Sequence, residues 1–386
     1  MARLKEYNGY YCESEYEYAF IGFLETEGWI YSSGNNISRV TKRDVLIADD
    51  FKKFIVDTNP DLTEDEVTQI FDNVRLVGSE SDFATLHKVY GWMVNGIQFT
   101  PQDGIARMIP LIDFKKDSNK NIFRVVNQFT VEYTNNGQKE NRRPDVLLFV
   151  NGMPLCVIEL KNPADANATI YDAWEQINIR YWRDIPHLLH YCTLACISDG
   201  VKTRLGTVHT PYEHFYAWRR VNDGDAVYTL PFEETETMIK GVYAPERFLE
   251  IFRDYIYFQD SIYDSDEVEI VCRYPQFFAA RLLRQSIINS VVQKSGKGGT
   301  YFGATGCGKT YTMAFLARQL ALRCTDIPEI GSPTIILIVD RDELQKQGAK
   351  LFTKSKEFLN LGEVSVVKNR TQLRQELGAR QSGGFY

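Results

Sequence analysis

The chain has 386 residues, of which 44% are hydrophobic and 25% are charged, and this length predicts two or three domains of about 100–200 residues each. No run of roughly 18 apolar residues is present, which excludes a transmembrane helix and a membrane partner. The net charge of −7 does not exclude DNA, because residues 221–270 hold thirteen acidic and three basic residues, a balance of −10, and the rest carries +3.

Helical and β-rich stretches alternate in the first part of the chain. Residues 14–30 predict a helix followed by a turn, and residues 39–95 are helical in character, with Thr63 and Glu66 spaced to form a capping box. Residues 97–161 are β-rich. We then expect, in chain order, a helix over about 166–183, a strand over 191–198, short strands to about 230 and a helix over 245–262. These elements make a predicted first domain at residues 1–260.

Residues 142–161, which read RRPDVLLFVNGMPLCVIELK, place charged residues at the ends of two apolar runs. Asp145 opens the first run, and Glu159 and Lys161 lie near the end of the second, two residues apart and therefore on one face of a strand. Two carboxylates with the backbone carbonyl of Leu160 suit Mg²⁺, and Lys161 would stabilise a water-derived hydroxide or the charge that develops on an attacked phosphodiester. Charges that only solvate the strand ends are the competing interpretation.

A shared metal ion imposes a geometric condition on this hairpin. A two-residue turn at Asn151-Gly152 pairs residues whose numbers sum to 303, which sets Asp145 opposite Ile158 and turns Glu159 to the other face. Both acids reach one ion only with a three-residue loop or one β-bulge between residues 146 and 158. We expect the irregularity near Pro154, which has no N–H to donate to a neighbouring strand.

A second domain is predicted at residues 261–386. Its first helix has Pro275 near its start, and a glycine-rich turn and a new α/β unit follow. Residues 332–347 begin with an apolar run typical of a parallel strand, as expected after the first helix of a RecA-like lobe. After residue 347 no apolar run followed by an Asp-Glu pair is present, so we expect this chain to bind ATP without hydrolysing it alone and to be the front part of a longer protein.

Residues 300–313, TYFGATGCGKTYTM, contain the pattern G-x-x-x-x-G-K-[ST] between an apolar run and a helical pattern. Its glycines let backbone N–H groups point at phosphate oxygens, and the helix N-terminus adds partial positive charge. Lys309 would bridge the β- and γ-phosphates, Thr310 would bind Mg²⁺, and the amide of Gln276 would read the adenine edge. The predicted ATP-binding residues are Gln276, Gly303, Thr305, Gly306, Gly308, Lys309 and Thr310.

Together these motifs resemble the N-terminal part of the endonuclease and translocase (R) subunit of type I restriction–modification systems. The matching residues, in chain order, are Glu17, Pro144-Asp145, Glu159-Leu160-Lys161, Ile197-Ser198-Asp199-Gly200, Arg273-Tyr274-Pro275-Gln276, residues 303–310 and Asp340-Arg341. The resemblance implies an α/β chain: an α+β nuclease domain of PD-(D/E)xK type, followed by the start of a RecA-like helicase lobe. It implies a type I site-specific deoxyribonuclease that cuts duplex DNA with Mg²⁺, translocates DNA with ATP, and works with modification (methyltransferase) and specificity subunits.

The resemblance also assigns roles to single residues. Asp145, Glu159 and Lys161 match the nuclease triad, with Leu160 and Glu17 as further metal contacts. The family commonly adds Q-x-x-x-Y on the next helix, whereas here Gln176 and Tyr181 are five residues apart. Either a π-type bulge brings both residues to the site, or one of them is displaced.

Two other functions stay open at the level of sequence. One is a DNA-repair helicase–nuclease that acts on DNA ends, and the other is a non-catalytic clamp or docking domain for a motor. The seven cysteines include no C-x-x-C pair, which favours free thiols and a cytoplasmic location.

Overall fold

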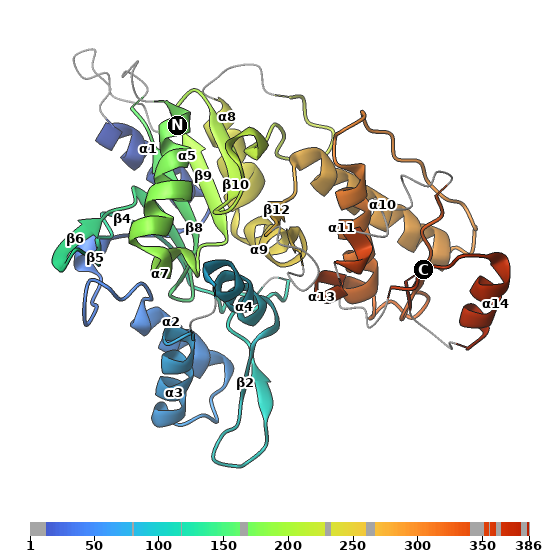
Figure 1. Cartoon of the computed structure of the whole chain (residues 1–386), viewed down its shortest axis with the longest axis horizontal. Helices are drawn as coiled ribbons and strands as arrows, with labels where there is room; N and C mark the ends of the chain where they lie inside the picture. Colours follow the sequence, from blue (N-terminus) through green and yellow to red (C-terminus); the bar gives the residue numbers. More distant parts are fainter. Residues whose placement is uncertain are drawn as a thin grey trace. The chain divides into compact units, whose positions relative to one another are not determined.

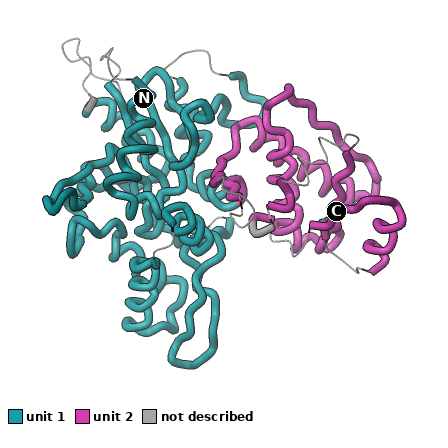
Figure 2. Tube along the Cα trace, in the orientation of Figure 1, with its two compact units in different colours: residues 1–253 teal, residues 254–386 magenta. Residues whose placement is uncertain are grey.

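The computed structural model describes residues 13–78, 81–116, 118–162, 169–227, 233–259, 267–339, 351–354, 356–359, 364–379 and 384–385. The chain forms two compact units, residues 1–253 and residues 254–386 (Figure 2). The sequence predicts a division at residue 260, seven residues after the end of unit 1, and the function of each domain stays a prediction. The match at Asp340-Arg341 lies outside the described residues.

Unit 1 is built on a six-stranded mixed sheet with the order β1-β4-β7-β8-β9-β10 (Figure 1). Two neighbouring pairs, β1 with β4 and β8 with β9, are parallel, and the other three are antiparallel. Every residue of β7 and β8 is buried, which suits the apolar side chains of these strands and also includes the charged Glu159 of β8. The strands are β1 (Ile30–Ser33), β4 (Phe123–Asn127), β7 (Val146–Val150), β8 (Met153–Leu160), β9 (Leu194–Ser198) and β10 (Thr203–Thr207).

Helices cover both faces of this sheet. Tyr16 of α1 (Glu13–Thr26) lies 2.7 Å from the Ser198 hydroxyl, and Ser198 pairs with Leu160. On the other side of the strand, Glu159 accepts a hydrogen bond from Tyr181, which ends the π-helix η2 (Gln176–Tyr181). Because neighbouring residues of a strand point to opposite faces, α1 and η2 lie on opposite sides of β8. The helix before η2, α5 (Ile170–Glu175), lies over β8 and β9 (Figure 1).

The remaining elements of unit 1 surround the sheet. The predicted capping box at Thr63 and Glu66 is confirmed at the start of α3. The other helices are α2 (Ala48–Thr58), α3 (Glu64–Arg75), α4 (Asp82–Asn95), α6 (Trp182–Asp184), α7 (Pro186–Leu189), α8 (Glu233–Met238), α9 (Pro245–Asp254), the π-helix η4 (Ile239–Tyr243), and the 3-10 turns η1 (Gly34–Asn36) and η3 (Tyr212–His214). Two hairpins pair β2 (Ile97–Phe99) with β3 (Arg107–Ile109) and β5 (Val131–Asn135) with β6 (Gln138–Arg142).

Unit 2 contains two long helices, α10 (Tyr274–Val292) and α11 (Lys309–Arg323). Pro275 occupies the first turn of α10, as predicted, where its missing N–H costs no helical bond. The other described elements are β11 (Ile256–Phe258), β12 (Glu269–Val271), β13 (Thr334–Ile335), α13 (Lys356–Leu359), α14 (Arg370–Ala379) and β14 (Gly384–Phe385). None of the described helices combines the length and apolarity that a membrane span requires.

Two predicted elements were wrong in extent. The helix expected over 245–262 ends at Asp254, because residues 256–258 pair with β12 as a buried strand. Their β-branched and aromatic side chains suit a strand, but the partner lies outside any local sequence window. The strand expected from residue 332 is limited, among the described residues, to Thr334–Ile335. A parallel strand needs neighbours, and β14 offers this segment two paired residues.

Candidate functional site

The hairpin of β7 and β8 carries the predicted bulge. Near the turn, Val150 pairs with Met153 and Phe149 with Pro154, whereas further along Leu148 pairs with Cys156. Leu155 is therefore the extra residue, next to Pro154. The turn keeps two residues, with φ of 50° at Asn151 and 77° at Gly152, as a type I′ turn requires. The prediction of a bulge between residues 146 and 158 is confirmed.

The bulge changes which residue faces Asp145. Beyond it, Leu147 pairs with Val157 and Val146 with Ile158, so continuing the register sets Asp145 opposite Glu159. The Leu160 N–H donates to Asp145 Oδ2 at 2.7 Å, which ties the Asp145 carboxylate to the end of β8. Asp145, directly before β7, and Glu159 of β8 therefore lie within reach of each other's charge.

Glu159 is fully buried, and its two carboxylate oxygens differ in environment. Oε1 accepts a hydrogen bond of 2.6 Å from the Tyr181 hydroxyl, whereas Oε2 has no hydrogen-bond partner among the described residues. Burial, and then the negative charge of Asp145, raise the pKa of Glu159 well above its usual value, and the Lys161 ammonium opposes this rise. A buried carboxylate oxygen without a partner is costly, and a bound cation would remove that cost.

Gln176 and Tyr181 both reach this site through the π-helix η2. Lys161 Nζ donates to Gln176 Oε1 at 3.0 Å, and Gln176 Nε2 donates to the Tyr181 hydroxyl at 2.8 Å. Tyr181 in turn donates to Glu159, which completes a hydrogen-bonded chain from the ammonium to the carboxylate. Residues five apart stack on one side of a π-helix, so of the two alternatives that the spacing left open the structure contains the π-type bulge.

The residues present fit Mg²⁺. Among the described residues, no group of three or more His, Cys, Asp and Glu side chains is placed to hold a metal ion. Mg²⁺ is nevertheless commonly held by one or two carboxylates, with waters completing its six ligands. The pair Asp145 and Glu159 meets that need. The Leu160 carbonyl points toward the β7 side of its strand, because the N–H and C=O of one strand residue share a direction and its N–H bonds Asp145.

Glu17 is engaged elsewhere. Its Oε1 accepts hydrogen bonds from Asn127 Nδ2 at 2.6 Å and from Gln128 Nε2 at 3.5 Å. Asn127 pairs with Val146, which pairs with Ile158, so strand alternation places its side chain on the face opposite Glu159. The described contacts of Glu17 therefore do not join it to the two acids, and its role as a metal contact stays a prediction.

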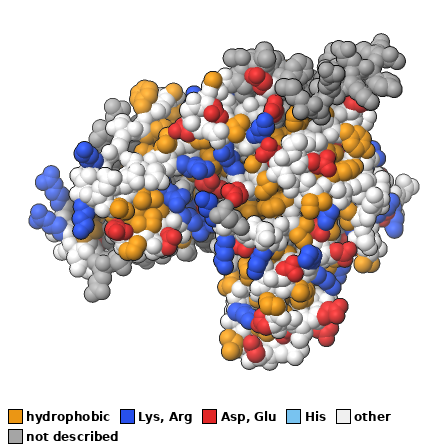
Figure 3. Space-filling model, turned by 180° about the vertical axis from the view of Figure 1, so that it is seen from behind, with side chains coloured by type: hydrophobic (Ala, Val, Ile, Leu, Met, Phe, Trp, Pro, Cys, Tyr) orange, Lys and Arg blue, Asp and Glu red, His pale blue; other side chains and the backbone are white. Residues whose placement is uncertain are grey.

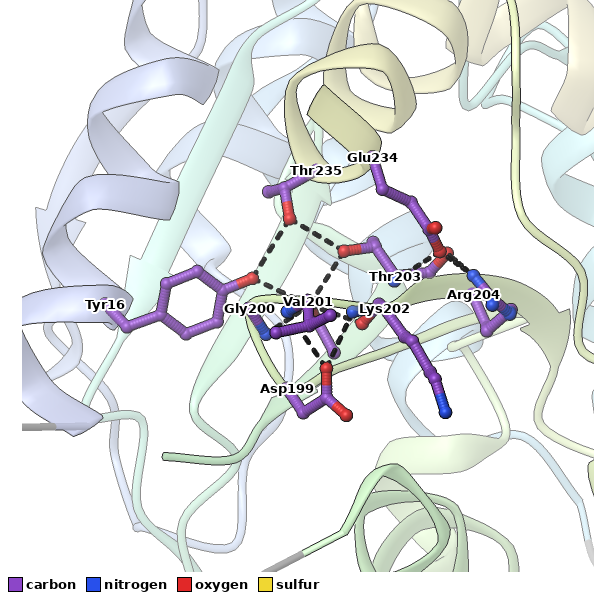
Figure 4. A network of polar contacts seen from close by, with 10 residues as sticks. Tyr16, Asp199, Gly200, Val201, Lys202, Thr203, Arg204, Glu234 and Thr235 are labelled. Carbon is purple, nitrogen blue, oxygen red and sulfur yellow. Dashed lines mark hydrogen bonds and ion pairs between the residues drawn. The ribbon is translucent and has the colours of Figure 1, made fainter. Parts of the chain in front are cut away.

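The turn between β9 and β10 is held by a buried polar network beside the end of β8 (Figure 4). The Ser198 hydroxyl lies 2.7 Å from the Tyr16 hydroxyl and 2.8 Å from that of Thr203. Asp199 Oδ1 accepts hydrogen bonds from the backbone N–H groups of Val201 and Lys202. Gly200 has a φ of 81°, which glycine adopts without strain. The motif Ile197-Ser198-Asp199-Gly200 thus builds a tight turn at the edge of the candidate site.

A pH dependence of stability follows from the raised pKa of Glu159. A raised pKa in the folded state means that this group stabilises the fold below its usual value of 4.5, and that this contribution is lost as the pH rises through the folded pKa. In EDTA, we expect the Glu159→Gln variant to gain stability relative to wild type as the pH is raised from 4.5, until the difference levels off. Urea unfolding at a series of pH values measures it. If the free energies of unfolding of wild type and Glu159→Gln differed by the same amount at every pH, the result would contradict the raised pKa of Glu159.

The phosphate-binding pattern lies at the start of α11. Gly308 precedes the helix with a φ of 79°, and Gly306 has the same value, so both glycines adopt the left-handed conformation that lets the loop curl. Lys309 Nζ donates to the Gly303 carbonyl at 2.8 Å and to the Ala304 carbonyl at 2.9 Å. The ammonium therefore lies over the loop, where phosphate oxygens would compete for it. Thr310 belongs to the first turn of the same helix.

Gln276 links this loop to the helix before it. Its Nε2 donates to the Gly308 carbonyl at 3.0 Å, and its Oε1 accepts from the Arg273 N–H at 2.8 Å. The side chain is 3% exposed. Both ends of the amide are thus bonded to backbone groups in this structure, and its contact with adenine stays a prediction.

Comparison with known proteins matches two separate parts of the chain to two families. Residues 10–214, just over half of the chain, match the family described as type I restriction enzyme R protein N terminus. Residues 275–385 match the SWI2/SNF2 ATPase family.

The curated relatives described below are all named as endonuclease subunits of type I restriction enzymes. The putative type I restriction enzyme MjaIXP endonuclease subunit of Methanocaldococcus jannaschii is 28% identical, over 87% of this chain and 34% of its own length. The type I restriction enzyme HindI endonuclease subunit of Haemophilus influenzae is 28% identical, over 97% of this chain and 36% of its own. The SauCOLORF180P endonuclease subunit of Staphylococcus aureus is 27% identical, over 67% and 24% respectively. The chain spans about a third of the length of the first two relatives.

Proposed function

The chain belongs to the family of the type I restriction enzyme R protein N terminus, and from this premise we propose that unit 1 is a Mg²⁺-dependent endonuclease for duplex DNA, of PD-(D/E)xK type. The observation that carries the proposal is the meeting of Asp145 and Glu159 through the β-bulge, with one buried carboxylate oxygen of Glu159 left without a partner among the described residues. Neither strand-end solvation nor a passive clamp accounts for a fully buried Glu159 beside a second acid.

Each residue of the site then has a role. Asp145, Glu159 and the Leu160 carbonyl would hold Mg²⁺, which supplies a Lewis acid for the phosphate and lowers the pKa of a bound water. Lys161 stabilises the hydroxide or the charge that develops on the phosphate. Gln176 accepts from the Lys161 ammonium and keeps it beside the acids. Tyr181 holds Glu159 Oε1 and stays a donor, because burial and the Glu159 charge raise its own pKa.

Unit 2 would bind ATP through the loop 303–310, as part of a motor that moves DNA toward the nuclease. The match to the SWI2/SNF2 ATPase family and the lysine that lies over the curled loop support this part of the proposal. The names of the relatives refer to endonuclease subunits, so we propose modification and specificity subunits as partners, with duplex DNA as the substrate.

Covalently closed circular duplex DNA tests the proposed activity. The chain, assembled with the modification and specificity subunits of its own system, should cut circular DNA in the presence of Mg²⁺ and ATP. The Asp145→Asn variant should bind the same DNA without cutting it, because it loses one of the two charges that hold the metal ion. Circular DNA that stays intact while linear DNA is degraded from its ends would instead indicate an end-dependent repair nuclease.

On the face drawn in Figure 3, basic and acidic side chains intermingle with apolar ones. The proposal therefore rests on the site itself, and the charge distribution of the surface adds no separate argument for DNA.

A further inference from the structure

The helix that carries Gln176 and Tyr181 is fixed from its other side by three side chains four residues apart, Trp174, Asn178 and Trp182. The indole of Trp174 donates to the Thr210 carbonyl at 2.9 Å, and the indole of Trp182 donates to the Val208 carbonyl at 2.9 Å. Trp174 precedes the π-helix η2 and Trp182 follows it. The two indoles therefore bracket the π-helix against the segment that follows β10.

Asn178 lies inside η2 and bonds both of these carbonyls. Its Nδ2 donates to Val208 O at 2.9 Å and to Thr210 O at 3.1 Å. Its Oδ1 is buried with no hydrogen-bond partner among the described residues, which makes this side chain costly to bury. An apolar residue of similar size could not make the two hydrogen bonds of Nδ2, so these bonds explain why an asparagine suits this position.

A π-helix is rare and occurs mostly as single turns, frequently at functional sites. We therefore expect η2 to depend on contacts that hold it in place. Residues five apart are separated by about 140° around an α-helix, whereas they stack in a π-helix. If η2 relaxed to an α-helix, Gln176 and Tyr181 would no longer lie on one side. Tyr181 would then lose its bond to Glu159, and Gln176 would not reach both Lys161 and Tyr181.

We propose that Asn178 is a positioning residue of the nuclease site: by clamping η2 to Val208 and Thr210, it keeps the π turn and thereby sets Tyr181 against Glu159. This inference rests on the proposed function for its catalytic consequence, but its structural part stands on contacts that involve no metal. The described hydrogen bonds of Asn178 go to backbone carbonyls of the 208–210 segment and not to Tyr181 or Glu159.

The sequence offers a direct rescue experiment. Asn178→Ala removes both bonds, and we expect Mg²⁺ affinity and DNA cleavage to fall about 10–100-fold, as for other groups that orient metal ligands. Deleting the exposed Ile179 in the same variant brings Gln176 and the tyrosine to the spacing Q-x-x-x-Y, which an ordinary α-helix aligns. This double variant should recover to within about threefold of wild type, a recovery that a merely structural loss would not show.

Three measurements make the test decisive. Two measurements report on the nuclease site: Mg²⁺ binding to the chain by calorimetry, and DNA cleavage by the assembled complex. The third, amide hydrogen exchange over residues 170–184 without Mg²⁺, reports on the contacts of Asn178 that hold η2. The control is Asn59→Ala, which removes a side-chain bond to the Ile55 carbonyl at the end of another helix and should leave all three unchanged. Wild-type values in Asn178→Ala, or no recovery on deleting Ile179, would overturn the proposal. Suppose that amide exchange is faster in Asn178→Ala, that deleting Ile179 reverses this, and that wild type does not bind Mg²⁺. The structural role of Asn178 would then stand, and the proposed nuclease function would be rejected.

Discussion

Glu159→Gln should abolish Mg²⁺-dependent DNA cleavage, by roughly 10³-fold or more, while leaving the protein at least as stable as wild type at neutral pH. The change keeps the shape of the side chain and the acceptor for Tyr181, but it removes the charge that would hold the metal ion. Because that charge is fully buried beside Asp145, its loss relieves a cost in the metal-free protein. Lost activity with retained or raised thermal stability is the expected pair of results.

The matched control is Glu175→Gln at the end of α5. Glu175 is partly exposed and pairs with Arg180, so the same chemical change there should leave cleavage within about twofold of wild type. Cleavage rates by the assembled complex and melting temperatures of the chain in EDTA measure both variants. A Glu159→Gln variant that still cuts DNA at a tenth of the wild-type rate would remove Glu159 from the reaction.

Lys309→Ala should lower ATP affinity by at least about 100-fold, since it removes the one side-chain charge that the loop pattern brings to the phosphates. The structure places this ammonium over the carbonyls of Gly303 and Ala304, so the loop loses a tether as well as a charge. ATP at about 100 times its dissociation constant should stabilise the wild-type chain by about 2.7 kcal/mol and the variant by much less.

Lys297→Ala serves as the control for Lys309, because Lys297 is an exposed lysine in the glycine-rich segment before the loop. Its removal should leave the ATP-induced shift of the melting temperature intact. Equal shifts in wild type and Lys309→Ala would show that nucleotide binds elsewhere or not at all. DNA cutting that needs no ATP, measured in parallel, would separate the nuclease from the proposed motor.

Simple counting along the sequence predicted the β-bulge of the site and made a π-type bulge one of two alternatives for the next helix. The sum of paired residue numbers showed that an unbroken hairpin would separate Asp145 from Glu159, and the structure inserts Leu155 as the bulge. The five-residue spacing of Gln176 and Tyr181 left two alternatives, a π-type bulge or one displaced residue, and the structure contains the bulge. Counting was informative at both places because strand and helix periodicities are rigid, so a mismatch in spacing has few structural remedies.

Other features depend on contacts that no local pattern contains. The clamp by Asn178 needs the carbonyls of Val208 and Thr210, thirty residues away, and only the folded chain brings them to η2. The bonds of the Gln276 amide to Gly308 and Arg273 are likewise visible only in the folded chain, and its predicted contact with adenine stays a prediction. The strand Ile256–Phe258 replaced the end of a predicted helix because a partner strand outweighed local propensity.

The most direct test of a shared metal ion at Asp145 and Glu159 is a crystal structure of the chain soaked in Mn²⁺ as a substitute for Mg²⁺, with the ion located by its anomalous signal. We expect one ion about 2.0–2.2 Å from carboxylate oxygens of both Asp145 and Glu159, with the ion absent from the Glu159→Gln variant. An ion bound elsewhere, or none in wild type while the β7–β8 bulge is intact, would contradict it.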